Sequence, residues 1–537
     1  MKRLASPPPL PRPLLCPLLL GLIAFSPLAL SEAGAATVTR GPYLQMGGPA
    51  GIVVRWRTDV ATDSRVRYGS APGNLTAFVN NAAATTEHEV TVTGLATDTQ
   101  YYYSVGTSTA TLAGGDSTYY WVTFPPAGAP VPTRIWVLGD SGTANSDATA
   151  VRDAYFNATG TRQTDLWLML GDNAYNSGTD AEYQAAVFDL YPTLLRRSVL
   201  FPTLGNHDTA QATQFVDTYP YFAIFTLPRN GEIGGVASGT EHYYSFDFGN
   251  LHFICLDSMT ANRSATGPMA TWLQNDLAAT TRDWVIAYWH HPPYSKGSHN
   301  SDTEIELVEM RQNFLPILEA GGVDLVLSGH SHSYERSYLI DGHYGVSSTF
   351  SSANVVDGGS GRDPSPYEKP SGLPAHAGAV YAVAGSSGQI SGGTLNHPAM
   401  FVSLNVLGSV VLDFTTNRLD LQFLDSAGAV RDRFAMLKSS VSPTPPAPPA
   451  GLTARAVGKR KIQLNWTQSA SVGVTQNRIY RSNTSGGPYG LLATIAAASS
   501  FSNAGLTRGV TYYYVVTAVN SAGLESDVSN QAAATAR

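Results

Sequence analysis

Five short apolar runs in the middle of the chain each end in a cluster of polar residues, and this pattern constrains the fold more than any other feature. The runs are RIWVLGDSG, LWLMLGDNAY, VLFPTLGNHD, WVIAYWHHPPY and VDLVLSGHSH. Each has the length and apolar character of a buried strand, while MATWLQNDLAAT and DTEIELVEMRQNFLPILEA have helical spacing of apolar positions. The region is therefore predicted to alternate strands and helices around a sheet. In such folds ligands bind beyond the carboxyl ends of the strands, where these polar clusters lie.

The polar clusters offer oxygen and imidazole donors to a metal ion. The candidate metal ligands are Asp140, Asp172, Tyr175, Asn206, His290, His330 and His332. No thiolate is among them, and this combination suits iron, manganese or zinc. Because one carboxylate can bridge two ions, seven side chains are enough to hold a pair. Two ions about 3.5–4 Å apart can clamp the attacking and leaving oxygens of a displacement at phosphorus.

Taken together, the five blocks resemble the calcineurin-like metallophosphoesterases. GDSG, GDNAY, GNHD, the HHPP segment and GHSH match the blocks of that superfamily in order. The purple acid phosphatase branch is the most similar, because Gly142 stands where most relatives have a histidine and Tyr175 follows the second aspartate by three residues. The resemblance implies a central α/β metallophosphoesterase sandwich of the α/β/β/α type. It also implies two metal ions and a tyrosine phenolate bound to ferric iron.

The resemblance further divides the ligands between two sites. The first site, expected to hold Fe(III), would consist of Asp140, Asp172, Tyr175 and His332. The second, expected to hold Fe(II), Zn(II) or Mn(II), would share Asp172 and add Asn206, His290 and His330. In the HHPP segment the implied ligand is His290, with His291 as its neighbour.

Two further histidines match positions that contact the substrate phosphate or protonate the leaving group. They are His207, next to Asn206, and His299, nine residues after His290. Histidine suits proton transfer because its reference pKa is about 6.5; the alternative for His299 is a solvated loop residue. Arg336 is expected to pair with a carboxylate and brace the GHSH loop. The histidines read as structural or solvated are His88, His242, His252, His343, His376 and His397.

The function implied by the resemblance is a secreted dinuclear-metal phosphatase. It would hydrolyse phosphate monoesters by in-line attack of a metal-bound hydroxide. A phosphodiesterase or nucleotide phosphohydrolase with the same metal centre is the nearest alternative. An alternative of another class is an exported adhesion or carbohydrate-binding protein whose central domain is inert.

Two stretches on either side of the central region repeat one β pattern. Each has a tryptophan on an alternating strand, at Trp56 and Trp466, and about 40 residues later a tyrosine-rich strand near Tyr101 and Tyr512. A tryptophan between two sheets and a tyrosine at a corner are typical of immunoglobulin-like sandwiches. Both stretches resemble fibronectin type III domains; unrelated β segments are the alternative, chiefly for the N-terminal copy.

These features divide the chain into a series of expected segments. They are a signal peptide over 1–36, an N-terminal fibronectin III-like domain over 37–128, a catalytic domain over 129–438, a Pro-rich linker over 439–450 and a fibronectin type III domain over 451–537. The signal is predicted from Lys2 and Arg3, a mostly apolar run and a small-residue cleavage site, with an uncleaved membrane anchor as the alternative. The expected location is therefore secreted, periplasmic or extracellular.

The amino-acid composition limits which kinds of partner the chain is expected to bind. Only 14% of residues are charged and the formal net charge is −7, so no nucleic-acid binding is expected. The expected substrate is a small phosphate ester, with no stable membrane insertion; contact of the C-terminal module with an extracellular polymer stays open. After removal of the signal Cys255 is the only cysteine, and LHFICLDS predicts a buried strand thiol.

Overall fold

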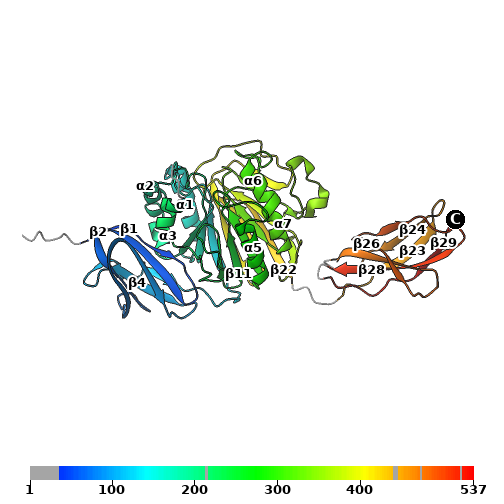
Figure 1. Cartoon of the computed structure of the whole chain (residues 1–537), viewed down its shortest axis with the longest axis horizontal. Helices are drawn as coiled ribbons and strands as arrows, with labels where there is room; N and C mark the ends of the chain where they lie inside the picture. Colours follow the sequence, from blue (N-terminus) through cyan, green and yellow to red (C-terminus); the bar gives the residue numbers. More distant parts are fainter. Residues whose placement is uncertain (1–35, 212–215, 440–444, 472–473, 521–522) are drawn as a thin grey trace, which may run out of the picture.

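The computed structural model describes residues 36–211, 216–439, 445–471, 474–520 and 523–537. Figure 1 shows three successive parts: a β module at the N-terminal side, a central α/β domain, and a second β module that ends at the C-terminus. The predicted signal peptide lies outside the described residues, apart from its last position, and so do residues 440–444 of the predicted linker. Within the described ranges, no helix combines the length and the apolar character needed to cross a membrane.

The N-terminal module is built from six strands. They are β1 (Val38–Gln45), β2 (Gly51–Gly69), β3 (Ala77–Thr93), β4 (Gln100–Gly106), β5 (Thr111–Gly114) and β6 (Tyr120–Val122). The order is β1-β2-β4-β5, with β3 also paired to β2 and β6 to β4. The predicted tryptophan, Trp56, is buried, and the hydroxyl of Tyr101 accepts a hydrogen bond from the amide of Ala96 at 3.0 Å. This is the tyrosine corner that the sequence pattern predicts.

The central domain contains two seven-stranded sheets packed face to face. The first has the order β10 (Tyr244–Phe248), β11 (Leu251–Cys255), β12 (Trp284–Trp289), β13 (Leu325–Ser328), β18 (Val380–Ala384), β14 (Tyr334–Ser337) and β19 (Met400–Leu404). The second has the order β17 (Tyr367–Pro370), β22 (Val430–Ser439), β21 (Arg418–Asp425), β20 (Gly408–Thr415), β7 (Thr133–Leu138), β8 (Leu166–Met169) and β9 (Val199–Pro202). A short pair, β15 (Leu339–Ile340) and β16 (Val355–Asp357), forms a separate two-stranded sheet, and Ile340 bridges to Ala379 directly before β18.

Helices cover the outer faces of the two sheets. In β12, Ile286 and Tyr288 belong to the core between the sheets, whereas Val285, Ala287 and Trp289 pack against helices on the other face. Both faces are therefore apolar, as expected for strands covered on both sides. The helices are α1 (Ser146–Thr159), α2 (Asp180–Tyr183), η1 (Gln184–Phe188), α3 (Pro192–Leu195), η2 (Val216–Thr218), α4 (Pro220–Ile224), α5 (Pro268–Ala279), α6 (Ile305–Glu309), η3 (Met310–Phe314), α7 (Leu315–Ala320), η4 (Ser347–Thr349) and η5 (Ser352–Asn354). The predicted α/β/β/α sandwich is confirmed.

The segment predicted to be helical over residues 302–320 is helical from Ile305 but changes its winding in the middle. Five residues from Met310 to Phe314 form a wider π turn between α6 and α7. Pro316 follows two residues after this turn and has no amide hydrogen to donate back into it. A π turn placed before a proline accommodates this break while the helix continues.

The five predicted strands carry their polar ends to one place, although they belong to both sheets. Strands β7, β8 and β9 are parallel neighbours in one sheet, and β12 and β13 are parallel neighbours in the other. Arg336 of β14 pairs with Asp432 of β22 at 2.6 Å, and both side chains are fully buried. This confirms the predicted carboxylate partner of Arg336. The pair joins the two sheets next to the GHSH loop.

The C-terminal module is a sandwich of a three-stranded and a four-stranded sheet. The first is β23 (Ala450–Ala456), β24 (Ile462–Thr467) and β27 (Ser500–Asn503); the second is β26 (Gly490–Ala496), β25 (Val474–Ser482), β28 (Thr511–Asn520) and β29 (Ala532–Thr535). Trp466 is buried in its core, and the hydroxyl of Tyr512 accepts from the amide of Thr507 at 3.1 Å. The seven strands and the tyrosine corner agree with the predicted fibronectin III-like module.

Candidate metal centre

The seven candidate ligands come together at the carboxyl ends of β7, β8, β9, β12 and β13. Each follows its strand within a few residues, so the parallel pairing of the strands determines where the side chains meet. Their side chains form two adjoining groups that share Asp172. No candidate ligand lies apart from the others.

The first group surrounds the hydroxyl of Tyr175. This oxygen lies 2.9 Å from Oδ2 of Asp172, 3.3 Å from Oδ1 of Asp140 and 3.3 Å from Nε2 of His332. Nε2 of His332 is also 3.5 Å from Oδ1 of Asp140. Two carboxylates, a phenol and an imidazole therefore point to one small volume.

The second group surrounds the side-chain oxygen of Asn206. Nε2 of His290 and Nδ1 of His330 each lie 3.0 Å from this oxygen, and the two nitrogens are 3.2 Å apart. The other oxygen of Asp172, Oδ1, lies 3.5 Å from Nε2 of His290. Asp172 thus turns one oxygen to each group, which is the geometry of a bridging carboxylate.

Contacts on the far side of each imidazole leave the inward-facing nitrogen available as a ligand. Nδ1 of His290 pairs with the carbonyl of Leu170 at 2.8 Å, and Nδ1 of His332 with Oγ of Ser391 at 2.7 Å. Nε2 of His330 lies 3.3 Å from Oε2 of Glu304. Such outer contacts orient metal-binding histidines and select the nitrogen that binds.

Backbone strain concentrates at the same residues. Asp140, Asp172 and His330 have φ of 56°, 51° and 67°, values that non-glycine residues seldom adopt. Each strained position costs of order 1–3 kcal/mol and persists because the surrounding structure holds it. Three of the seven candidate ligands share this feature, which is typical of functional loops rather than of ordinary turns.

The glycine before a ligand is required by space. A Cβ on Gly205 would lie 2.2 Å from the amide nitrogen of Asp172, and a Cβ on Gly329 would lie 2.5 Å from Oδ2 of Asp140. Neither neighbour is a flexible chain end, because both belong to the centre itself. The glycines of GNHD and GHSH therefore allow the loops to approach each other closely.

The electrostatics of the centre call for a cation. Burial, together with the charges of Asp140 and Asp172, raises the pKa of Tyr175 far above its ordinary value. Burial lowers the pKa of His330 to about 4, so that its ring is neutral at pH 7. The centre places carboxylates beside a phenol and two imidazole nitrogens 3.2 Å apart. Such groups interact unfavourably with one another but are good ligands for metal ions. The donor set fits two hard or borderline cations.

His207 and His299 lie on the rim of the centre. Nδ1 of His207 pairs with the carbonyl of Asn176 at 2.7 Å, and its Nε2 is 4.0 Å from Oδ2 of Asp172. The ring of His299 packs against that of His330 with centroids 3.7 Å apart and the two planes tilted by 32°. His299 therefore contacts a candidate ligand, while its side chain stays partly exposed on the loop.

Glu304 also contacts the centre, although the sequence motifs do not predict it. Its Oε2 lies 2.8 Å from Nδ1 of His299 and 3.3 Å from Nε2 of His330, and Oε1 accepts from the amide of Asn300 at 2.8 Å. One carboxylate therefore contacts both a candidate ligand and a candidate proton donor. No motif marks it, because Glu304 sits at the start of a helix where glutamate is ordinary.

Asp208 was also missed, although it is the last residue of GNHD. It is buried and accepts hydrogen bonds from the amides of Asn173 and Gly205 and from the hydroxyl of Tyr183, the last at 2.6 Å. Burial and the charge of Asp172 raise its pKa to about 7. Asp208 ties the GDNAY loop to the GNHD loop, and its place inside a motif was the available signal.

The other histidines lie outside the two donor groups. His291 pairs with Oγ of Ser258 at 2.8 Å through Nδ1, while its ring lies 4.4 Å from that of His330. His252 is buried between Asp247 and Asp276, at 2.7 and 2.8 Å. His252 thus has structural surroundings of the kind expected for it, and His291 lies beside the centre as the neighbour of His290. Cys255 is buried in β11, as predicted.

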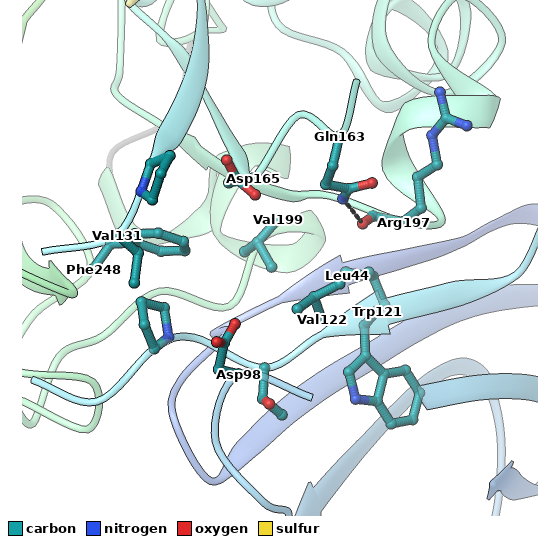
Figure 2. A pocket seen from close by; sticks show the side chains of 13 residues that line it. Leu44, Asp98, Trp121, Val122, Val131, Gln163, Asp165, Arg197, Val199 and Phe248 are labelled. Carbon is teal, nitrogen blue, oxygen red and sulfur yellow. Dashed lines mark hydrogen bonds between the residues drawn. The ribbon is translucent and has the colours of Figure 1, made fainter. Parts of the chain in front are cut away.

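A cavity of about 340 Å³ lies away from the centre, at the junction of the N-terminal module and the central domain. Figure 2 shows Asp98 on one side and Asp165 on the other, with Val122, Val199 and Leu44 among the side chains between them. Burial raises the pKa of Asp165 to about 6. None of the cavity's lining residues is a candidate ligand, so the cavity does not belong to the centre.

Comparison with known families supports the same reading of the central and N-terminal parts. Residues 133–334 match the calcineurin-like phosphoesterase family, and residues 40–125 match the purple acid phosphatase N-terminal domain. The first range begins at β7 and ends at the first residue of β14, so it contains all seven candidate ligands. The second spans most of the N-terminal module.

Individual proteins show the same likeness at low identity. Purple acid phosphatase 15 of Arabidopsis thaliana is 29% identical over 278 residues, covering 47% of this chain and 49% of the relative. Purple acid phosphatase 1 of Ipomoea batatas is 29% identical over 322 residues, covering 56% and 63%. The chain therefore spans less than two thirds of the length of either relative. The solved purple acid phosphatase PPD1 of yellow lupin shares the fold, with a TM-score of 0.57, 18% identity and coverage of 76% and 77%.

Proposed function

We propose that this chain is a metal-dependent phosphoester hydrolase that acts on phosphate monoesters, because residues 133–334 match the calcineurin-like phosphoesterase family and residues 40–125 match the purple acid phosphatase N-terminal domain. The observation that carries the proposal is the shared Asp172, whose two oxygens face two separate donor groups. A carboxylate in that position would hold two ions, one at each donor group, for a displacement at phosphorus.

In this proposal the two donor groups hold different ions. Asp140, Tyr175 and His332, with Asp172, suit Fe(III), because a phenolate and carboxylates favour a highly charged ion. Asn206, His290 and His330, again with Asp172, suit Fe(II), Zn(II) or Mn(II). When bound, the ions would supply a nucleophile by lowering the pKa of water and would neutralise charge on the phosphoryl oxygens.

The residues on the rim would bind and protonate the substrate. Nδ1 of His299 is turned to Glu304 and Nδ1 of His207 to the carbonyl of Asn176, so each ring keeps Nε2 for the substrate. A proton delivered from one of these Nε2 atoms to the ester oxygen would allow the alcohol to leave neutral. Direct displacement of this kind predicts inversion at a chiral phosphorus, and retention would contradict it.

The proposal is tested on the purified full chain with a chromogenic aryl phosphate. Turnover should disappear on chelation and return when Fe or Zn ions are added. Parallel assays with an aryl diester and a nucleotide separate the monoesterase from the alternative hydrolases. An adhesion or carbohydrate-binding protein would turn over none of these substrates, with or without metal, and that result would overturn the proposal.

The role of Tyr175 has a separate optical test. If its phenolate binds Fe(III), the iron-loaded chain has a visible absorption band that Tyr175→Phe lacks. Tyr243→Phe serves as the control, because Tyr243 packs on Trp272 away from the centre. An identical spectrum in wild type and Tyr175→Phe would remove Tyr175 from the metal site.

The proposed site of action is outside the cytoplasm. This proposal is supported by the sequence of residues 1–36, in which basic residues are followed by an apolar run and then by small residues. Fractionation of the producing cells tests it: an exported chain is recovered with the secreted proteins and begins near residue 37.

A further inference from the structure

We propose that the N-terminal module positions Tyr175 and His207 through a chain of contacts that runs from Arg40 and Arg57 to the loop that carries Tyr175, and from the carbonyl of Asn176 in that loop to the ring of His207. The module is then a working part of the centre rather than a separate attachment. The inference rests on the proposed function only for its activity readout, because the chain of contacts is structural.

The chain starts at Asp180, which receives two arginines from the N-terminal module. Nη1 and Nη2 of Arg57 donate to its two carboxylate oxygens at 2.6 and 2.7 Å, and Nη1 of Arg40 donates to Oδ1 at 2.9 Å. Arg40 also donates to the carbonyl of Asp180 at 3.1 Å and to Gln184 at 2.7 Å. The side chain of Arg40 is fully buried, so these hydrogen bonds replace the ones that its guanidinium would make with water. Arg57 and Arg40 hold the pKa of Asp180 at about 2.

The next link is helix α2, of which Asp180 is the first residue. Thr179 caps the helix, and its hydroxyl and Glu182 form a capping box. The carboxylate of Glu182 then reaches further back than a capping box requires. It accepts from the amide of Asn176 at 2.7 Å and from the amide of Ser177 at 3.1 Å.

The last link connects this loop to the centre. Asn176 follows Tyr175 directly, and its carbonyl holds Nδ1 of His207 at 2.7 Å. The rings of Tyr175 and His207 lie 4.5 Å apart. A shift of Glu182 would therefore move one candidate ligand and one candidate proton donor together.

Simple docking of the module does not require this path. Other contacts attach the module elsewhere: the hydroxyl of Tyr43 donates to the carbonyl of Ile224 at 2.7 Å, Arg55 donates to that of Ala223 at 2.6 Å, and the hydroxyl of Tyr103 donates to that of Arg196 at 2.9 Å. These bonds remain if Asp180 is changed. A variant at Asp180 thus separates positioning from attachment.

The lead variant is Asp180→Ala, and the chain offers a matched control. Asp413 also receives two arginines, Arg134 at 2.6 Å and Arg162 at 2.9 Å, but it lies on β20 and makes no contact with the loop over residues 175–182. Asp413→Ala therefore removes a similar ion-pair cluster without touching the proposed path. Asp180→Asn, which keeps the size of the side chain, is the second variant if the alanine chain does not fold.

The first readout is amide hydrogen exchange in the full chain without metal. Exchange in the peptide covering residues 175–182 should be at least tenfold faster in Asp180→Ala than in wild type and in Asp413→Ala, because Asn176 and Ser177 lose a well-placed acceptor. The second readout is steady-state kinetics with the aryl phosphate. The value of kcat should fall roughly tenfold in Asp180→Ala with a smaller change in KM, since misplacement of about 1 Å near the chemistry is costly.

Equal exchange in the 175–182 peptide of wild type and both aspartate variants would overturn the inference. A second result would also overturn the inference: a folded Asp180→Ala chain that keeps the wild-type kcat while losing as much thermal stability as Asp413→Ala. The ion pairs of Asp180 with Arg40 and Arg57 would then only attach the N-terminal module. If wild type itself shows no phosphatase activity, the proposed function fails, while the exchange experiment still decides whether the module orders the loop.

Discussion

Adding a single methyl group at Gly329 should disable the centre while leaving the fold intact. In Gly329→Ala the new Cβ would lie 2.5 Å from Oδ2 of Asp140 and 3.0 Å from the carbonyl oxygen of Leu170. Ordinary contact begins near 3.4 Å, so one side must retreat by about 1 Å. Asp140 cannot do so freely, because the same Oδ2 accepts from the amide of His330 at 2.7 Å.

The expected loss follows from that displacement. Overpacking of this kind costs about 1–3 kcal/mol of stability, and a 1 Å misplacement of catalytic groups costs on the order of 100-fold in rate. We therefore expect kcat for the aryl phosphate to fall roughly 100-fold and bound metal per chain to fall with it. Activity, metal content by elemental analysis and the thermal transition are measured on the same preparation.

The control is Gly358→Ala. Gly358 has an ordinary φ, and a Cβ there would meet only Val355 Cγ1 at 3.5 Å. That variant should keep the activity and metal content of wild type. If Gly329→Ala binds metal normally and retains kcat within twofold, the two loops are not packed as closely as described, and the steric argument for the GHSH glycine is wrong.

Three further changes test other parts of the structure. Asp432→Ala leaves the buried Arg336 without its carboxylate and should destabilise the central domain by about 3–5 kcal/mol in urea unfolding; a loss below 1 kcal/mol would mean that water or another group replaces the pair. For His252, burial alone would lower the pKa, but Asp247 and Asp276 raise it to about 9, while Arg282 lies 3.3 Å from Asp247. The stabilisation from His252 should therefore be complete below pH 6.5 and disappear as pH rises through 9, and unfolding of His252→Gln should lack this dependence; parallel pH curves for the two proteins would contradict this. Glu304→Gln should reduce kcat for the aryl phosphate by about tenfold or more and weaken metal retention, because it loosens His299 and His330 together, whereas Glu306→Gln, two residues further along in the first turn of α6, should change neither.

Much of the centre was predictable from the sequence because its residues are tied to short local patterns. A strand followed closely by a ligand is a contiguous signal that recurs five times between residues 134 and 333, and in four of the five a glycine directly precedes the ligand. The two tyrosine corners are local as well, since each joins residues only five positions apart, Ala96 to Tyr101 and Thr507 to Tyr512. Local periodicity also fixes which face of a strand is apolar.

The remaining contacts depend on which elements become neighbours, and no local pattern encodes that. Arg40 and Asp180 are 140 positions apart, and Arg336 and Asp432 are 96 apart. Both pairs join elements from different sheets or modules. The local sequence around an arginine or aspartate does not show whether the side chain faces water or a buried partner. Its role is therefore decided only when the sheets pack.

The sequence by itself thus determined the donor types, the glycines beside them and the β character of the flanking modules, because each follows from residues close together in the chain. The tertiary structure alone decided that Asp172 faces two donor groups, that Glu304 contacts both His299 and His330, and that Asp180 receives the N-terminal module. These contacts arise where strand ends from two sheets and a third element meet. Their geometry is set by packing over the whole domain, which short-range preferences do not specify.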